Sequence, residues 1–455
     1  MSPTSDYTPD EIFKTAEGDD VPFYILQFKK NGDLLPKSKE KLHEIINRSN
    51  QFSDIFLFSH GWNNDWEWAN KRYRAFFKAF TDLRTKHNLG MSADYKPLLI
   101  GVFWPSTALV FGERERGPMK TNIAKADVSD SEEEETEYQK CLDEIASLLD
   151  ATDQQTLRKL VQDERLEEDA ALELASLASK ISFDNEAEDN ITQYADANQI
   201  HQGWLHDHKT NVLPDTKAPH LMGKQDKDTA SILSKLDPRR VIRLLTVALM
   251  KDRAGVVGYH GVGPVLQALL NQSQARLHLI GHSYGAKVVL SALSATKPSS
   301  RKVHSALLLQ PAISYLAFAN SLPDNTGKKG GYNNLLTRVE APIFATFSSH
   351  DFALHKVFHW ALRRNTDYGE IDTQSKNIPP DIPSRYAALG GYGPRMSNEN
   401  LITLESPGTS YTLGTGVRVF GLNGSSNKKI DDHGAVISEH TAWALYSLTQ
   451  YKAPL

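Results

Sequence analysis

Short, continuously apolar runs alternate along the chain with longer segments in which apolar positions recur at helical spacing. Continuous apolar runs are typical of strands that are buried on both faces of a parallel sheet, whereas apolar positions three and four residues apart are typical of amphipathic helices. The pattern predicts strands at residues 21–28, 54–59, 97–104, 276–280, 305–309, 341–347 and 416–421. It predicts helices at residues 38–47, 66–85, 238–250, 262–271, 286–293 and 438–451. Strands that alternate with helices indicate the α/β class, with a mostly parallel central sheet flanked by helices.

The middle of the chain has a different composition. Residues 107–255 are polar and helix-prone, and they include the acidic run 127–137. We therefore expect one α/β core built from residues 1–106 and 256–455, interrupted by a large helical, acidic insertion. By its position, the insertion is either a cap or lid over a site or a lateral helical subdomain. The acidic run is most simply a solvated surface, with a regulatory or partner-binding segment as the alternative.

Composition and charge narrow the class of protein. The chain of 455 residues is 40% hydrophobic and 24% charged, which is ordinary for a soluble globular protein. Its net charge of −5 gives no reason to expect a nucleic-acid partner, which usually needs a basic surface. Cys141 is the single cysteine, so no intrachain disulfide can form. Residues 1–6 show no secretory signal, and no apolar run reaches the ~20 residues of a transmembrane segment, so we expect a cytoplasmic protein. Export by a route without a cleaved signal stays open.

The motif G-H-S-Y-G at residues 281–285 lies between a predicted strand and a predicted helix. A serine in a sharp turn from strand to helix is the arrangement of a nucleophile elbow. The two glycines fit this turn, because a side chain at either position would clash with the neighbouring strand and helix. The sequence therefore predicts that Ser283 is a nucleophile.

A serine hydroxyl needs a histidine to accept its proton and a carboxylate to orient that histidine. Asp351 follows the predicted strand at 341–347, so it should lie at the same edge of the sheet as the serine. The alternative is that Asp351 only caps the next predicted helix, at 352–363. Asp367 and Asp372 are weaker candidates for the orienting carboxylate.

His433 is the candidate base. It lies in a polar loop between the last predicted strand and the last predicted helix, where a loop can bring an imidazole over the serine. His440 is the alternative base, although it falls inside the predicted helix, where a packed or surface histidine is the simpler interpretation. Asp431 and Asp432 could ligate a metal together with His433, but no further residues complete a set with recognisable spacing. We therefore expect neither a metal nor a cofactor.

The run His60-Gly61-Trp62 follows the predicted strand at 54–59, which should lie beside the strand that precedes Ser283. The backbone N–H groups of Trp62 and Tyr284 are the candidate donors of an oxyanion hole. The alternative is a tight turn that simply ends a strand.

Together these motifs resemble the α/β-hydrolase superfamily, in its serine esterase and lipase group. The resemblance covers residues 20–105 and 256–451, and it implies the α/β-hydrolase fold with an acyl-serine mechanism. It also implies that Ser283 is the nucleophile, that His433 is first base and then acid, and that Asp351 orients His433. The oxyanion segment has a single glycine, where some esterases of this fold have a run of glycines.

The sequence thus favours a serine hydrolase that cleaves a carboxylic ester, with a small-molecule acyl ester or a lipid as substrate. Two alternatives stay open: a thioesterase, amidase or acyltransferase on the same residues, and a non-catalytic binding scaffold. Arg253 could contact an anionic substrate group, although a structural ion pair or a surface charge is the simpler interpretation. Aromatic side chains after the oxyanion segment could line an acyl pocket or pack in the core; they are Trp62, Trp66, Trp68, Tyr73, Phe76 and Phe77.

Overall fold

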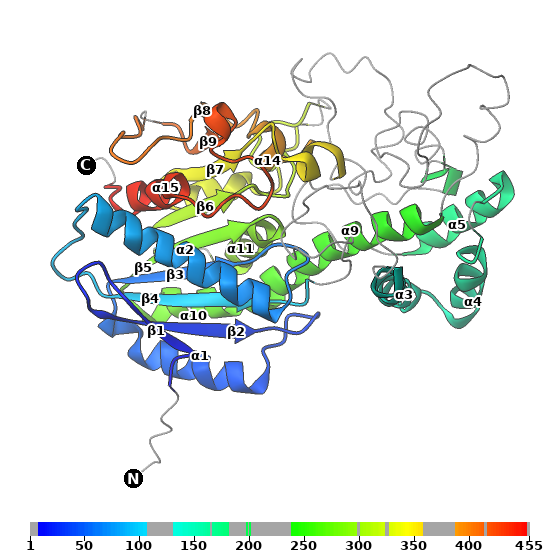
Figure 1. Cartoon of the computed structure of the whole chain (residues 1–455), viewed down its shortest axis with the longest axis horizontal. Coiled ribbons are helices and arrows are strands. Elements are labelled where there is room, and N and C mark those ends of the chain that lie inside the picture. The colour runs from blue at the N-terminus through cyan, green and yellow to red at the C-terminus, as the bar shows by residue number, and fades with distance from the viewer. Residues whose placement is uncertain are drawn as a thin grey trace, which may run out of the picture.

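A nine-stranded sheet forms the centre of the part of the chain that the structure describes (Figure 1). The structure is a computed structural model, and it describes residues 8–106, 131–163, 166–181, 197–198, 200–201, 238–297, 301–323, 327–357, 387–413 and 416–452. The strand order is β1-β2-β4-β3-β5-β6-β7-β9-β8, and within this sheet only β1 runs antiparallel to its neighbour. The strands are β1 (Glu11–Lys14), β2 (Asp20–Gln27), β3 (Asp54–Ser59), β4 (Pro97–Phe103), β5 (Arg276–His282), β6 (Ser305–Leu309), β7 (Ile343–Phe347), β8 (Asn400–Thr403) and β9 (Val419–Asn423). The predicted α/β class with a mostly parallel sheet is confirmed.

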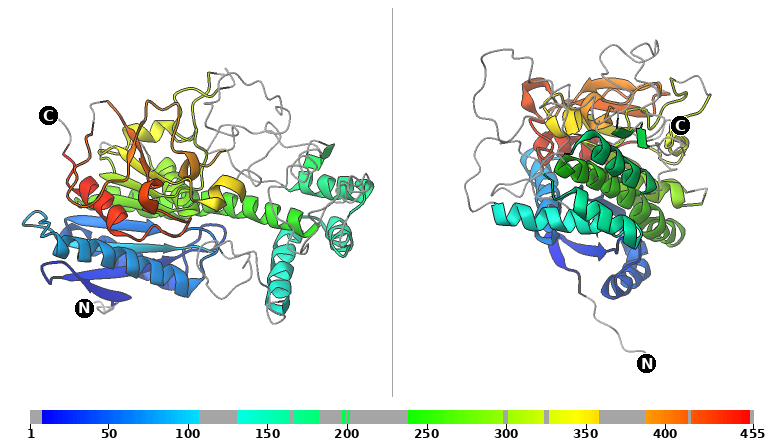
Figure 2. Two further views of the ribbon diagram at one scale, coloured as in Figure 1. Left: turned by 45° about the horizontal axis from the view of Figure 1, so that its top comes forward. Right: turned by 90° about the vertical axis from the view of Figure 1, so that its right-hand side faces the viewer.

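Helices cover both faces of this sheet (Figure 2). The central strands supply apolar side chains to a core layer on each face. Successive side chains of a strand point to opposite faces. Ile55 and Leu57 of β3 accordingly belong to one apolar cluster, and Phe56 and Phe58 belong to the other. The first cluster lies under α1 (Pro36–Arg48), α10 (Gly263–Gln272) and α11 (Tyr284–Ala295), and the second lies under α2 (Trp66–Lys86) and α15 (Glu439–Thr449). Strands buried on both faces explain why their sequences read as continuous apolar runs.

A group of helices extends from one end of the sheet (Figures 1 and 2). It consists of α3 (Ser131–Ala146), α4 (Ala151–Leu160), α5 (Glu168–Lys180) and the start of α9 (Pro238–Val256). Arg253 of α9 fixes this group to the sheet, because its guanidinium pairs with Glu144 of α3 at 2.7 Å and donates to the Pro105 carbonyl at 3.0 Å. Arg253 therefore forms a structural ion pair, which is one of the interpretations that the sequence left open. Burial alone would raise the pKa of the Glu144 carboxyl, but Lys30 and Arg253 outweigh it and lower this pKa.

Several elements differ from the sequence prediction at their ends. The edge strands β1 and β8 are not predicted, because each is short and alternates half-buried with exposed positions. The last predicted strand, 416–421, begins too early, since β9 covers Val419–Asn423. The helix predicted at 352–363 begins as a π-helical turn, Ala353–Val357, and its remainder lies outside the described residues. The limits of the predicted insertion, 107 and 255, stay a prediction.

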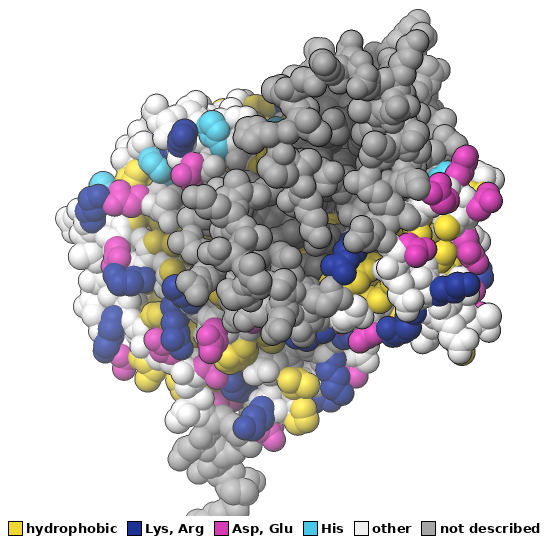
Figure 3. Space-filling view, turned by 45° about the vertical axis from the view of Figure 1, so that its right-hand side comes forward, with side chains coloured by type: hydrophobic (Ala, Val, Ile, Leu, Met, Phe, Trp, Pro, Cys, Tyr) yellow, Lys and Arg dark blue, Asp and Glu magenta, His cyan; other side chains and the backbone are white. Residues whose placement is uncertain are grey.

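The described surface mixes charges of both signs. On the face shown in Figure 3, basic and acidic side chains are interspersed over the coloured part of the surface. Among the described residues, none of the helices combines the length and the apolar character that crossing a bilayer requires.

Candidate active site

Ser283 occupies a strained turn between β5 and α11. Its backbone has φ 55° and ψ −124°, in a region that residues with a side chain rarely adopt. Such a conformation costs of order 1–3 kcal/mol and persists only where neighbours hold it. Here the Ser283 N–H donates to the Leu309 carbonyl at 3.0 Å, and the Ser283 carbonyl accepts from the Ala312 N–H at 3.2 Å. The chain at the end of β6 therefore holds the turn on both sides of the serine.

Three glycines allow the chain to pack around this turn. A Cβ on Gly281 would lie 2.5 Å from the Ala286 Cα, and a Cβ on Gly285 would lie 2.1 Å from the Ser59 carbonyl oxygen. The structure therefore leaves no room for a side chain at either of the two motif glycines, as the sequence predicts. A Cβ on Gly61 would lie 2.6 Å from the Ser283 Cβ, so the turn after β3 directly contacts the serine.

His433 lies between Ser283 and Asp351. Its Nδ1 is 2.7 Å from the Asp351 Oδ2, and its Nε2 is 2.8 Å from the Ser283 Oγ. A carboxylate can only accept, so Nδ1 carries the proton and Nε2 is left to accept the proton of the serine hydroxyl. Asp351 is 0% exposed, Ser283 5% and His433 8%. The three side chains follow β7, β5 and β9, so they meet at the edge formed by the carboxyl ends of parallel strands.

Gln310 is a site residue that the sequence analysis missed. Its side-chain amide donates to the Asp351 Oδ2 at 2.8 Å and to the Gly390 carbonyl at 3.1 Å. The Leu354 N–H donates to the other carboxylate oxygen, Oδ1, at 3.0 Å. With His433, these donors leave Asp351 fully hydrogen-bonded on both oxygens although it is buried. Gln310 directly follows the predicted strand 305–309, just as Asp351 follows the predicted strand 341–347. The same reasoning from position could therefore have placed Gln310 at the site.

The alternative base makes a different contact. His440 is in α15, and its Nδ1 is 3.3 Å from the Glu405 carbonyl oxygen. Burial is the main cause that lowers the pKa of His440. His433, and not His440, is therefore the histidine that the structure brings to Ser283. Asp367 and Asp372 lie outside the described residues.

Asp431, Asp432 and His433 are not arranged as a set of three metal ligands, since the described residues contain no group of three or more histidine, cysteine or acidic side chains suited to a metal ion. Asp432 instead shapes the loop. Its Oδ1 accepts from the N–H groups of Gly434 at 2.6 Å and Ala435 at 2.8 Å. Both bonds fix the backbone directly after His433.

The turn that contains His60, Gly61 and Trp62 lies beside the serine. β3 pairs in parallel with β5, as the sequence predicts, so the residues that follow the two strands are neighbours. His60 donates through Nδ1 to the Gly61 carbonyl at 2.8 Å and accepts through Nε2 from the Trp104 N–H at 3.2 Å. Burial lowers the pKa of His60 to about 4, so this ring is neutral and serves the backbone. The oxyanion role of the Trp62 and Tyr284 N–H groups stays a prediction.

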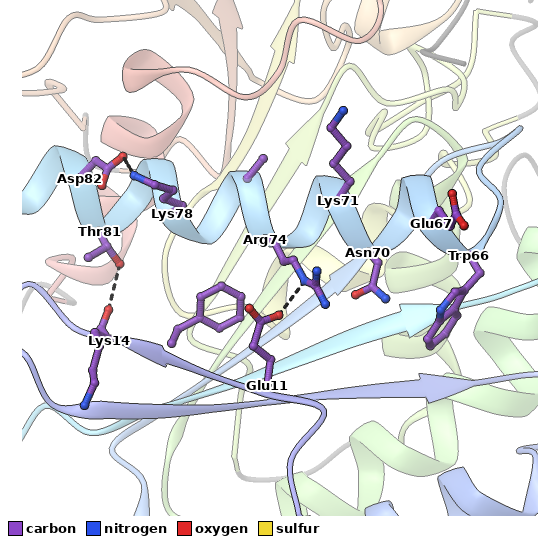
Figure 4. Close-up of a pocket in the computed structure, with 12 residues that line it drawn as sticks. Glu11, Lys14, Trp66, Glu67, Asn70, Lys71, Arg74, Lys78, Thr81 and Asp82 are labelled. Atoms are coloured by element: carbon purple, nitrogen blue, oxygen red, sulfur yellow. Dashed lines mark hydrogen bonds and ion pairs between the residues drawn. The ribbon is translucent and has the colours of Figure 1, made fainter. Parts of the chain in front are cut away.

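The aromatic residues of α2 mostly pack in the core. Tyr73, Phe76 and Phe77 belong to the apolar cluster beneath α2, and the Tyr73 hydroxyl donates to the Val102 carbonyl. Trp66 is 37% exposed and borders an open groove of about 830 Å³ between α2 and β1 (Figure 4). Arg74, also in this groove, pairs with Glu11. Ser283, Asp351 and His433 do not line this groove.

Comparisons with known proteins do not add to this picture. No protein-family model, curated protein or solved structure matches the chain. The geometry of the site is therefore what supports a function.

Proposed function

We propose that this protein is a serine hydrolase that cleaves carboxylic esters through an acyl-enzyme. The single observation that carries the proposal is the line of hydrogen bonds from Ser283 through His433 to Asp351, with the serine on a strained turn. A serine that is only structural needs neither an unfavourable backbone conformation nor a histidine whose second nitrogen is held by a buried carboxylate.

In the acylation step, the Ser283 Oγ attacks the ester carbonyl carbon while the His433 Nε2 takes the hydroxyl proton. Asp351 stabilises the imidazolium that results and keeps its ring in place. The tetrahedral intermediate then collapses, the bond to the alcohol breaks, and the His433 Nε2–H protonates the departing alkoxide. The acyl group remains on the Ser283 Oγ.

In the deacylation step, His433 takes a proton from water, whose oxygen attacks the acyl carbonyl. The second tetrahedral intermediate then collapses, the bond between the acyl carbon and the Ser283 Oγ breaks, and the acid is released. The His433 Nε2–H protonates the Ser283 Oγ, so the side chains end as they began. The backbone N–H groups of Trp62 and Tyr284 are the proposed donors to the oxyanion in both steps. Support comes from the contact of the Gly61 position with Ser283 and from the place of Tyr284 at the start of α11.

The finer fold assignment belongs to the same proposal. We assign the sheet and its helices to an α/β-hydrolase fold, and residues 107–255 to a helical insertion in it. The support is that the serine, the carboxylate and the histidine follow β5, β7 and β9 in that chain order, which is the order this fold uses.

Steady-state hydrolysis tests the proposal. A panel of p-nitrophenyl esters from acetate to octanoate, with a thioester and an anilide of the same acyl groups, is compared for wild type, Ser283→Ala, His433→Ala and His440→Ala. We expect ester turnover in wild type, a loss of kcat of at least about 10³-fold in the first two variants, and no loss in the third. Turnover that survives Ser283→Ala would contradict the proposal. A preference for the thioester or the anilide would leave the roles of Ser283 and His433 unchanged but would change the proposed substrate class.

A further inference from the structure

Two buried side chains hold the backbone of the loop that carries His433. The His282 Nε2 is 2.9 Å from the His433 carbonyl oxygen, and the Arg72 Nη2 donates to the Gly434 carbonyl at 3.2 Å. His282 is the last residue of β5 and directly precedes Ser283, whereas Arg72 comes from α2. Two consecutive carbonyls of one loop are therefore fixed from two different elements.

His282 has the chemistry of a dedicated donor. It is 1% exposed, and burial, followed by the charges of Arg72 and His433, places its pKa well below 6.5, so the ring is neutral. A carbonyl oxygen can only accept, so the proton of the neutral ring is on Nε2. The Nδ1 atom then has no hydrogen-bond partner among the described residues, and it faces the Gly61 turn. A buried acceptor without a partner costs free energy, which an apolar side chain of similar size would avoid.

Arg72 completes the hold on the next peptide. Its side chain is buried, and burial lowers its pKa to about 10, so it remains charged near neutral pH. The Gly434 N–H is already bound by Asp432, so the Gly434 residue is held at its N–H by one side chain and at its carbonyl by another. The His433 ring and the His282 ring lie 5.1 Å apart between centroids, which leaves the His433 ring little room to turn.

We propose that His282 and Arg72 are positioning residues of the proposed reaction, which set the His433 ring between Ser283 and Asp351 by fixing the His433 and Gly434 carbonyls. This inference rests on the proposed function for its kinetic consequence. Displacement of a reacting group by about 1 Å can cost two orders of magnitude in rate, so loss of either donor should lower kcat rather than raise KM.

The first test compares His282→Leu, which removes the donor, with His282→Gln, whose amide nitrogen can reach the same carbonyl. We expect His282→Leu to lower the rate constant for phosphonylation by a fluorophosphonate, and kcat for the best ester, by about 10- to 100-fold with KM little changed. His282→Gln should recover most of this loss. An unchanged rate in His282→Leu, or an equal loss in both variants, would overturn the inference.

Arg72→Met tests the second donor, with Arg84→Met as its matched control. Arg84 is also buried in α2 and also donates to a backbone carbonyl, that of Leu89, far along the chain from the His433 loop. We expect both variants to lose stability but only Arg72→Met to lose kcat. Equal kcat in the two variants would overturn the role of Arg72. If His282→Leu fails to fold, this pair still tests whether the hold on the loop matters for kcat.

A spectroscopic measurement separates this inference from the proposed function. The proton that His433 shares with Asp351 should give a low-field ¹H NMR signal that does not depend on turnover. We expect the signal in wild type and in His282→Gln, and its loss in His282→Leu. If the signals follow this pattern but the wild-type serine is unreactive, only the proposed function is contradicted. A signal that persists in His282→Leu would contradict the positioning role.

Discussion

Asp351 performs two hydrogen-bonding tasks with its two carboxylate oxygens. Oδ1 accepts from the Leu354 N–H, as a cap of the following turn would, and Oδ2 accepts from His433 and Gln310. The sequence offered capping and orientation of the base as alternatives, and the geometry contains the contacts of both. A substitution can separate them, because the two tasks use different oxygens.

Asp351→Asn should leave the cap in place and remove the negative charge beside His433. The amide oxygen can still accept from Leu354, but the amide nitrogen would meet the His433 Nδ1–H and the Gln310 amide as a third donor. We expect kcat for the best ester to fall on the order of 10³- to 10⁴-fold with KM little changed. Steady-state kinetics checks this, and a loss below about tenfold would show that the charge is not needed.

The sequence predicts the place of a single site residue where that residue follows a predicted strand. Ser283, Asp351 and His433 each follow a predicted strand, so the sequence alone placed them at one edge of the sheet. Arg72 and His282 could not be found in this way, because their partners are backbone carbonyls more than a hundred residues away in sequence. Only packing reveals which carbonyl a buried side chain reaches.

At the scale of elements, the sequence predicts the buried strands well and the edge strands poorly. Strand β3 was predicted with both ends as observed, since all of its positions are buried. Strands β1 and β8 each have one neighbour and a half-exposed face, so their short sequences carry no continuous apolar signal.

The contact between α11 and β3 gives an element-scale prediction. Gly285→Ala would place a methyl group 2.1 Å from the Ser59 carbonyl oxygen and 2.5 Å from the His60 carbonyl oxygen, both backbone atoms of the sheet edge. We expect a loss of about 1–3 kcal/mol in the free energy of unfolding, or more, together with a loss of serine reactivity. Gly90→Ala is the control, because a Cβ there meets nothing within 4 Å. Equal urea midpoints for the two variants would contradict the close approach.

At the scale of the whole molecule, the amino ends and the carboxyl ends of the parallel strands carry different polar networks. Opposite the candidate site, the buried His278 binds Asp54 through Nε2 at 2.9 Å and Ser305 through Nδ1 at 2.8 Å. These residues lie at or near the amino ends of β5, β3 and β6, away from Ser283. All three are buried, so we interpret this network as structural.

Buried neutral histidines should make the fold sensitive to acid. Burial lowers the pKa of His60 and of His278 to about 4, and that of His282 well below 6.5. Between about pH 6.5 and pH 4 the unfolded chain therefore binds protons that the folded chain does not. With respect to these histidines, the free energy of unfolding is highest above about pH 6.5. It falls as the pH drops below this value, by up to about 1.4 kcal/mol per pH unit for each histidine.

Urea unfolding between pH 7.5 and pH 5 measures this slope. His278→Gln should reduce the slope of the unfolding free energy against pH, because one of the three buried histidines no longer contributes to it. This holds even if the variant is less stable at every pH. The Asp54 carboxyl does not offset the effect: burial raises its pKa, but His278, Ser53 and Arg276 outweigh burial and lower it from 3.8. Its contribution is therefore lost only at still lower pH. A stability that is flat from pH 7.5 to pH 5 would contradict the account of neutral buried histidines.

The central claim is that Ser283 is an activated nucleophile, and covalent labelling tests it most directly. Wild type, Ser283→Ala, His433→Ala and His440→Ala are each treated with a fluorophosphonate, and the adduct is counted by intact mass and located by peptide mapping. The account predicts one adduct per chain on Ser283 in wild type and in His440→Ala, and none in the other two variants. Absence of an adduct in wild type, or an adduct on another residue that survives Ser283→Ala, would contradict it.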